Sequence, residues 1–96
     1  MHPRRCSRER LGTLTDLPNI GPAMARALES LGCLRPADLI GRDPLELYRS
    51  LCRQRGARQD PCVLDVFLSI EHFLAGGDAR PWWEFTAERR RRHPDL

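Results

Sequence analysis

The stretch "LTDLPNIGPAMARAL", residues 14–28, constrains the fold more than any other part of this sequence. It places two prolines, an asparagine, an isoleucine and a glycine, residues 18–22, between two short apolar segments. Proline disfavours helical geometry in the residue before it, and glycine and asparagine tolerate the positive φ that a sharp reversal needs. The stretch predicts a tight turn between two closely packed helices, with one or two residues at positive φ. Gly21 is expected to supply one, Asn19 is the next most tolerant, and Ile20 is expected to fill the gap between the helices.

Helix signals recur on both sides of this turn. Thr13 is a candidate N-cap, with Asp16 three residues further on, for a single helical turn that Pro18 stops. Three longer helices are expected over about 22–31, 44–55 and 61–75. Each begins at a proline and is followed by a glycine, and aspartates at 43 and 60 precede two of the prolines.

Apolar residues at helical spacing predict which faces of these helices are buried. "RPADLIG" predicts another short turn with Leu39 and Ile40 inward, and a last amphipathic segment, "PWWEFTAERRRR", begins at Pro81. β-Branched alternation is missing throughout, so no strand is expected. The fold class is therefore all-α, a compact bundle of five or six short helices. The expected core includes Leu14, Leu17, Met24, Ala27, Leu28, Leu31, Tyr48, Leu51, Cys52, Val63, Val66, Phe67, Ile70, Phe73 and Leu74.

The length and composition fit one globular domain. The chain has 96 residues, 41% of them hydrophobic and 30% charged. No apolar run approaches the roughly 20 residues that span a bilayer, and no secretory signal is apparent, so a cytoplasmic location is expected. The four cysteines form no C-x-x-C pair. Reduced thiols are therefore expected, with no metal site and no cofactor.

The net charge of +3 is unevenly distributed. Residues 1–10 and 89–96 each carry four arginines against one acid, whereas residues 11–88 carry eight arginines against eleven acids. This pattern predicts a flexible basic arm over 1–12, a helical domain over 13–88 and an Arg-rich tail over 89–96. A solvated tail is one interpretation of the last segment, and electrostatic help to nucleic-acid binding is the other.

The predicted turn has a chemical consequence. Backbone N–H groups near residues 19–23 would lack intrahelical partners at the start of the second helix, where the helix dipole favours negative charge. Such a group of free donors is suited to bind an anion. An interhelical turn that binds no ligand is the alternative.

"LPNIGPAMARAL" resembles the helix-hairpin-helix motif, in which an L-P-G-[IV]-G hairpin holds a DNA backbone phosphate through main-chain amides. Asn19 stands where that family usually has its first glycine. The resemblance implies that duplex DNA is bound without base specificity. The amides of Asn19, Ile20, Gly21 and Ala23 would contact one phosphate, and Arg26, one turn into the helix, would add charge.

A wider resemblance covers about residues 13–92. "TLTDLPNIGPAMA", "PADLIGRDPLELY", "RQDPCVLDVF" and "PWWEFTAERR" together resemble the pathogenicity-locus family of small bacterial helix-hairpin-helix proteins. The order of elements is also similar to the tandem helix-hairpin-helix domain at the end of competence-regulator proteins. The resemblance implies a helix-hairpin-helix core of the kind found in SAM-domain-like folds, whereas the family's name reports genomic context rather than a mechanism.

A second hairpin holds the other DNA strand in tandem domains, and "CRQRGARQDPC" occupies the matching place here. We expect a second phosphate contact at this segment, with Gly56 as its turn glycine. It lacks the G-h-G pattern, and a solvated helix end is the alternative, since arginines are favoured at helix C-termini. The candidate basic residues are Arg49, Arg53, Arg55 and Arg58.

Three other features have competing interpretations. Trp82 and Trp83 could stack on unpaired bases, but a core role is favoured, with one ring buried and the other half exposed. Cys62, early in its helix, could have a depressed thiol pKa, but its apolar neighbours favour a small packed residue. A helical protein-interaction module that uses the two tryptophans competes with nucleic-acid binding. No enzyme is expected, because no nucleophile, base and acid are found together.

Overall fold

The computed structural model describes all 96 residues as four α-helices and five short 3-10 helices, with no β-strand. The α-helices are α1 (Pro22–Ser30), α2 (Pro44–Arg55), α3 (Cys62–Leu74) and α4 (Thr86–Arg92). The 3-10 helices are η1 (Pro3–Arg5), η2 (Arg8–Arg10), η3 (Leu14–Asp16), η4 (Pro36–Leu39) and η5 (Trp82–Phe85). The all-α prediction is confirmed. The short turns expected before Pro18 and in "RPADLIG" are single 3-10 turns rather than α-helices.

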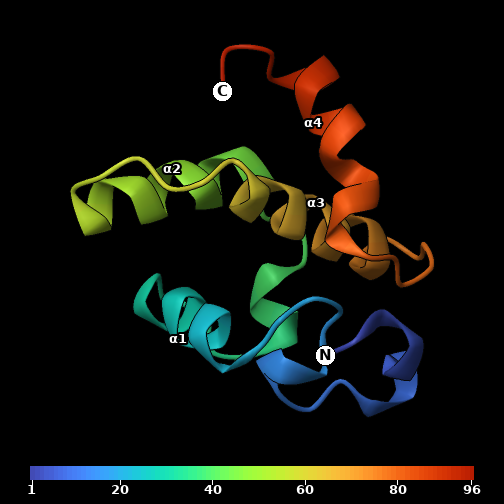
Figure 1. Ribbon diagram of the computed structural model, residues 1–96. Coiled ribbons are helices and arrows are strands. Elements are labelled where there is room, and N and C mark those ends of the chain that lie inside the picture. Colours follow the sequence, from blue (N-terminus) through green and yellow to red (C-terminus); the bar gives the residue numbers. More distant parts are fainter.

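α3 is the central helix, and α2, α4 and η5 pack against it (Figure 1). Eight of its thirteen residues are buried, because apolar side chains extend around most of its circumference. Four of its six predicted core residues, Val66, Phe67, Ile70 and Phe73, are buried. The other two, Val63 and Leu74, are half-buried and pack against the core. None of the helices combines the length and apolar character that a membrane-spanning segment requires.

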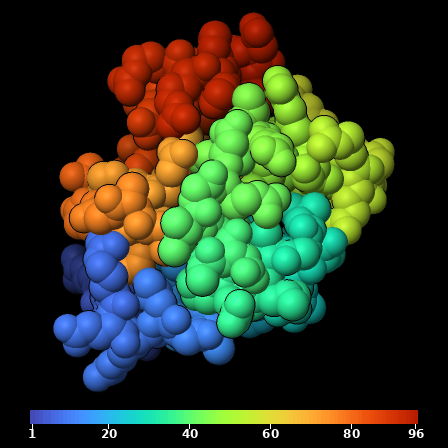
Figure 2. Space-filling model, turned by 180° about the vertical axis from the view of Figure 1, so that it is seen from behind, coloured from blue at the N-terminus to red at the C-terminus, as the bar shows by residue number.

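The two ends of the chain lie at opposite ends of the molecule. Both the ribbon and the view from behind place the N-terminal residues far from α4 and the C-terminus (Figures 1 and 2). The molecule measures 36 × 27 × 21 Å. The two Arg-rich ends therefore form separate surfaces rather than one continuous basic face.

Local caps define the helix boundaries as expected. The carboxylates of Asp43 and Asp60 accept hydrogen bonds from the amides of Leu45 and Cys62, at 3.2 and 2.9 Å. These bonds satisfy donors at the starts of α2 and α3. Gly56 ends α2 in the left-handed conformation, with φ 63°. Since each cap lies within a few residues of its helix, the sequence is sufficient to locate it.

The prediction for the turn at "RPADLIG" is wrong at one residue. Leu39 is buried as expected, whereas Ile40 is 64% exposed. Leu39 ends the 3-10 turn, and Ile40 already has an extended backbone with φ −63° and ψ 125°. Consecutive side chains point in different directions at such a junction, so only one of the two reaches the core.

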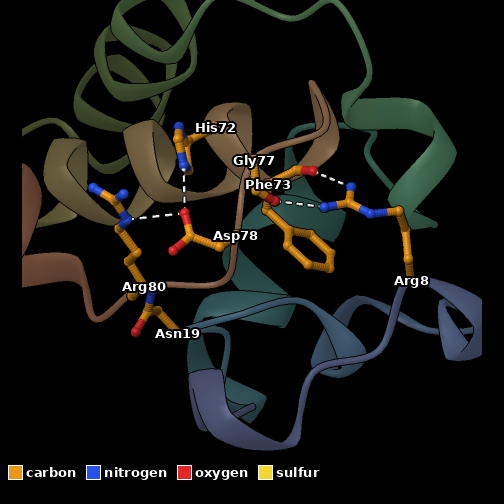
Figure 3. A network of polar contacts seen from close by, with 7 residues as sticks. All are labelled: Arg8, Asn19, His72, Phe73, Gly77, Asp78 and Arg80. Carbon is orange, nitrogen blue, oxygen red and sulfur yellow. Dashed lines mark hydrogen bonds and ion pairs between the residues drawn. The ribbon is translucent and has the colours of Figure 1, made fainter.

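Residues 1–12, expected as a flexible basic arm, are folded against the domain. They form η1 and η2, and Cys6 and Leu11 pack against the core. The Arg8 guanidinium donates hydrogen bonds to the carbonyls of Phe73 and Gly77 and lies 4.4 Å from the centre of the Phe73 ring (Figure 3). Arg8 therefore binds carbonyls at the C-terminal end of α3, where an arginine is favoured by the helix dipole.

The expected Arg-rich tail, residues 89–96, is in part a structural element. α4 continues to Arg92, and Arg89 is buried, with its Nε 2.8 Å from Oδ1 of the buried Asp65. Thr86 Oγ1 donates to the other oxygen of this carboxylate at 2.7 Å. The hydrogen bond to Asp65 raises the pKa of Arg89. Arg89 faces α3 and links α4 to it, whereas Arg90 and Arg91 are exposed.

Candidate nucleic-acid interface

The turn between η3 and α1 reverses at one residue rather than two. Asn19 has φ 66°, as predicted, and it is the only residue other than glycine with a positive φ. Gly21 has φ −94° and ψ −178°, so the prediction of positive φ at Gly21 is wrong. Asn19 alone reverses the chain, and Gly21 then enters α1 as its N-cap in an extended conformation. Ile20 is fully buried, as expected.

Two of the four amides predicted to face an anion are bonded within the chain. The Asn19 amide donates to the Met1 carbonyl at 2.7 Å, and the Ile20 amide donates to the Leu17 carbonyl at 3.4 Å. The prediction that these two amides are free is therefore wrong. The first is satisfied by the N-terminal residues folding back, and the second by the tightness of the turn itself.

The amides of Gly21 and Ala23 have no acceptor within the chain, as predicted, and the same holds for Met24. Pro22, which has no N–H, lies between the first two. The first bond of α1 runs from the Ala25 amide to the Gly21 carbonyl, at 2.9 Å. Three unsatisfied donors therefore remain at the start of α1, the end that carries the partial positive charge of the helix dipole.

Gly21 has no structural need to be glycine. A Cβ atom built on it meets no atom within 4 Å, and its φ is accessible to any residue. Ser, Thr, Asp and Asn are at least as favourable as glycine at an N-cap, so capping does not explain the choice either. The open space beside Gly21 leaves its amide accessible to a ligand.

The Asn19 side chain does not cover these amides. Its Nδ2 donates to Ser69 Oγ at 2.9 Å and to the Arg80 carbonyl at 2.8 Å, so it points into the domain. Arg26 lies one turn into α1 and is exposed, with no salt bridge or hydrogen bond from its side chain. Arg26 and the three free amides thus share the N-terminal part of α1.

An open hollow lies beside Gly21. Its lining includes Asn19, Gly21, Trp82 and Trp83, together with N-terminal residues 1–3. Trp82 is half-buried and packs against the core, whereas Trp83 is 60% exposed. The two rings meet edge to face, with centroids 5.7 Å apart. The expectation that one ring is buried and the other half exposed is met only in part, because Trp82 is half-buried against the core and Trp83 is mostly exposed.

At the second predicted contact, unlike the first, most backbone amides are bonded within the chain. In the segment after α2, the amides of Gly56 and Ala57 donate to carbonyls of the last turn of α2, both at 3.2 Å. The Gln59 amide donates to the Cys52 sulfur at 3.4 Å, and the Tyr48 hydroxyl donates to the Gln59 carbonyl. Most amides of this turn are therefore used within the chain, so any phosphate contact here depends on side chains.

The four arginines predicted at this second contact are all exposed. Arg53 donates to Ser50 Oγ at 3.0 Å, and Arg55 donates to Gln59 Oε1 at 2.8 Å. Arg49, Arg53 and Arg58 lie around a shallow hollow. They form a basic patch, but one without the free main-chain donors found at α1. The other residues lining the hollow are Tyr48, Cys52, Gly56, Ala57 and Leu96.

The two candidate contacts lie at opposite ends of α1. Ser30 and Gln54 are joined by two hydrogen bonds, at 2.7 and 2.9 Å, which hold the C-terminal ends of α1 and α2 together. Since α1 has nine residues, its length at 1.5 Å per residue is about 13 Å. The free amides therefore lie at the end of α1 that is remote from the C-terminal end of α2, around which the basic patch is placed.

Cys62 does not have the depressed pKa of a reactive thiol. Its pKa is raised, first by a hydrogen bond with the Asp60 side chain and then by burial. A neighbouring carboxylate disfavours the thiolate, which is the nucleophilic form. The raised pKa argues against a reactive thiol, and Cys62 is half-buried rather than part of the core.

Comparison with known proteins identifies the family. The model of the family described as "Pathogenicity locus" matches residues 7–91. This chain belongs to that family. This chain is also similar to the mitomycin resistance protein McrB of Streptomyces lavendulae, with 45% identity over 78 residues, which cover 81% of this chain and 74% of that protein. No solved structure matches the chain. The resemblance inferred from the four sequence blocks is thus confirmed at the level of the family.

Proposed function

We propose that this chain is a small, non-enzymatic helix-hairpin-helix protein of the cytoplasm that binds nucleic acid through backbone phosphates. Duplex DNA is the expected substrate, bound without base specificity. The hairpin consists of η3, the turn at Asn19 and α1. The amides of Gly21, Ala23 and Met24 bind one phosphate, and Arg26 adds charge beside it.

The arrangement at Gly21 carries this proposal. Three adjacent free amides lie at a helix N-terminus, beside a glycine that neither the backbone conformation nor packing requires. A side chain at this position would obstruct an anion approaching the amides, while it would leave the fold intact. Glycine is thus explained by a ligand more readily than by the fold.

The basic patch at the end of α2 supplies additional, weaker contacts. Guanidinium groups attract phosphates at a distance and are screened by salt. With about four to six contacts in all, log K should fall against log salt with a slope near −0.9 per contact, that is, roughly −3.6 to −5.4. The patch comprises Arg49, Arg53, Arg55 and Arg58, which surround Gly56.

Fluorescence anisotropy with a labelled duplex at two salt concentrations tests the proposal. Gly21→Val should fold normally and lower the affinity about 100-fold, since it obstructs two or three charge-assisted hydrogen bonds. Gly12→Ala is the matched control, because a Cβ at Gly12 meets its nearest atom at 3.6 Å and Gly12 lies outside the hairpin. If Gly21→Val binds as tightly as the unchanged protein, the hairpin is a structural turn and the proposal fails.

Residues 90 and 91 provide a second control. Deletion of the whole Arg-rich segment would remove the buried Arg89 and perturb the fold. Replacing the exposed Arg90 and Arg91 by Gln removes two charges and leaves that ion pair intact. A duplex affinity that depends on these two arginines, but not on Gly21, would indicate non-specific attraction to a basic helix.

The exposure of Trp83 favours a second candidate function, a protein-interaction module. A partner protein would cover the Trp82–Trp83 face, and the hairpin would serve the fold alone. Under this alternative, Trp83→Ala abolishes binding of the partner protein. Neither the unchanged protein nor Gly21→Val then binds the labelled duplex more tightly than a simple polycation does. The two functions thus predict opposite results in the anisotropy experiment.

The name of the Streptomyces relative suggests a cellular assay. By analogy with that protein, which is named for mitomycin resistance, we propose that this chain contributes to resistance in its own host. A strain that carries Gly21→Val should then be as sensitive to mitomycin as a strain without the gene. Equal resistance of the Gly21→Val strain and the unchanged strain would separate the resistance from the hairpin.

A further inference from the structure

Asn19 occupies a position at which glycine would be easier. Its φ of 66° lies in the left-handed region, which costs free energy for any residue with a Cβ and least for glycine. Chain reversal alone therefore does not explain an asparagine here. The side chain must contribute something that the backbone conformation does not.

The side chain of Asn19 makes two long-range hydrogen bonds. Nδ2 donates to Ser69 Oγ on α3 and to the Arg80 carbonyl in the segment before η5, at 2.9 and 2.8 Å. Both hydrogens of one amide group are thus used, by acceptors 50 and 61 residues further along the chain. They tie the hairpin to two separate elements, which fixes its orientation as well as its distance from α3.

The first acceptor is rigidly held. Ser69 is fully buried, and its hydroxyl donates to the Val66 carbonyl at 2.6 Å, one turn earlier in α3. The hydroxyl hydrogen is therefore used, and a lone pair of Oγ is directed at Asn19. Since α3 is the central helix, this bond connects the hairpin directly to the core.

The second acceptor is held by the segment 76–81. Asp78 Oδ1 lies 3.0 Å from His72 Nε2 and 2.9 Å from Arg80 Nε, which fixes the segment to α3 (Figure 3). Arg8 binds the Gly77 carbonyl from the other side. Gly77 lies directly against the His72 ring, because a Cβ there would be 2.3 Å from Nε2. The Arg80 carbonyl is thus presented by a segment with several separate attachments.

We propose that Asn19 is a positioning residue for the phosphate site, and that Ser69 and the segment 76–81 hold it in place. Its two bonds fix the turn so that the amides of Gly21, Ala23 and Met24 converge on one anion. The inference rests on the proposed function and deepens it. We call the two hydrogen bonds from Asn19 to Ser69 and Arg80 the Asn19 clamp. Through this clamp, α3 and the segment 76–81 orient the phosphate site without contacting the ligand.

Asn19→Gly distinguishes the contribution of the two side-chain hydrogen bonds from that of the positive φ, because it removes the side chain and keeps the backbone conformation. Glycine adopts the same φ without strain and leaves the amides at least as exposed. If Asn19 served only the backbone conformation, Asn19→Gly would therefore bind duplex as tightly as the unchanged protein or more tightly. The clamp predicts the opposite. The affinity for a labelled duplex should fall about tenfold, the effect expected from misalignment of one charge-assisted hydrogen bond. Anisotropy is measured at a temperature where circular dichroism shows the variant folded.

Ser69→Ala and Ser30→Ala form a matched pair. Each serine hydroxyl bonds the carbonyl three residues before it, but Ser30 lies at the far end of α1. Ser69→Ala removes one of the two acceptors and should lower the affinity about threefold. Ser30→Ala should leave it unchanged. Reduced thermal stability of the Asn19 and Ser69 variants, with unchanged affinity of the folded proteins, would overturn the proposal.

Gly21→Val distinguishes failure of the clamp from failure of the proposed function. If Gly21→Val loses binding and Asn19→Gly does not, the phosphate site stands and the clamp is disproved. If neither variant loses binding, the site itself is absent, and both proposals fail. Loss of binding in both variants, with Ser30→Ala unaffected, supports both.

Discussion

The turn before α1 and the turn after α2 both contain a glycine, yet the two glycines are present for different reasons. Gly56 has φ 63° and ends α2, and the amides around it are bonded within the chain. Gly21 has an ordinary extended conformation, open space at its Cα and free amides beside it. The turn after α2 bonds the amides of Gly56 and Ala57 within the chain, whereas the turn before α1 leaves three amides free, and these are the donors that the proposed function assigns to a ligand.

The two glycines should differ in which property their replacement changes, either the stability of the fold or the affinity for duplex. The largest effect on stability is expected at Gly56. Gly56→Ala forces a Cβ into the left-handed region and should lower the free energy of unfolding by about 1–2 kcal/mol. The affinity of the folded protein for duplex should not change. Gly21→Ala should show the reverse, with clearly weakened binding and a smaller loss of stability, which comes only from alanine being a poorer N-cap than glycine.

Urea unfolding and duplex anisotropy, measured on both alanine variants, check this prediction. Gly41→Ala is a control for the strain, because Gly41 has φ 78° and lines a hollow with Glu71, Leu74 and Ala75, apart from both candidate contacts. Equal loss of stability in Gly21→Ala and Gly56→Ala would show that the two turns are of the same kind.

Replacing an arginine near either turn should change the affinity for duplex by similar amounts, in contrast to replacing the two glycines. Arg26→Gln and Arg53→Gln each remove one exposed charge, and each should reduce the affinity about threefold and lower the salt slope by roughly one. If Arg53→Gln has no effect while Arg26→Gln does, the basic patch after α2 is a solvated helix end. Anisotropy over a series of salt concentrations gives both quantities.

The smallest effect concerns Asp78 in the segment that holds Asn19. The hydrogen bonds from His72 and Arg80 lower its pKa from 3.8 to about 2. A lowered carboxyl pKa contributes stability above the unfolded value of 3.8, and the contribution is lost as the pH falls toward 2. Asp78→Asn should lack this pH-dependent contribution to stability, so its melting temperature should fall less between pH 5 and pH 2 than that of the unchanged protein. Thermal melts over this range measure the difference. Identical pH dependence of the two proteins would contradict the assignment.

Local signals in the sequence predicted most of the fold. Aspartates, prolines and glycines located the helix ends to within about a residue, because each cap acts on its own helix. The sequence also indicated Asn19 as a residue with positive φ and Ile20 as buried. These features depend on neighbours a few residues away and on the preference of apolar side chains for the core.

Long-range contacts could not be predicted in this way. Nothing in "RRRR" distinguishes Arg89, whose partner Asp65 lies 24 residues earlier. The same is true of Arg8, which binds carbonyls 65 and 69 residues away. The bond from the Asn19 amide to Met1 removed one donor from the predicted site for this reason. A partner distant in sequence leaves no pattern at either residue.

The central claim is that an anion binds the free amides before α1 and not the turn after α2. Its most direct test is a titration of ¹⁵N-labelled protein with a short DNA duplex, followed by amide chemical shifts. The account predicts the largest changes at Gly21, Ala23 and Met24, with much smaller ones at Gly56 and Ala57. Unchanged shifts at Gly21 and Ala23, with the largest changes in the turn after α2 or along α4, would contradict it.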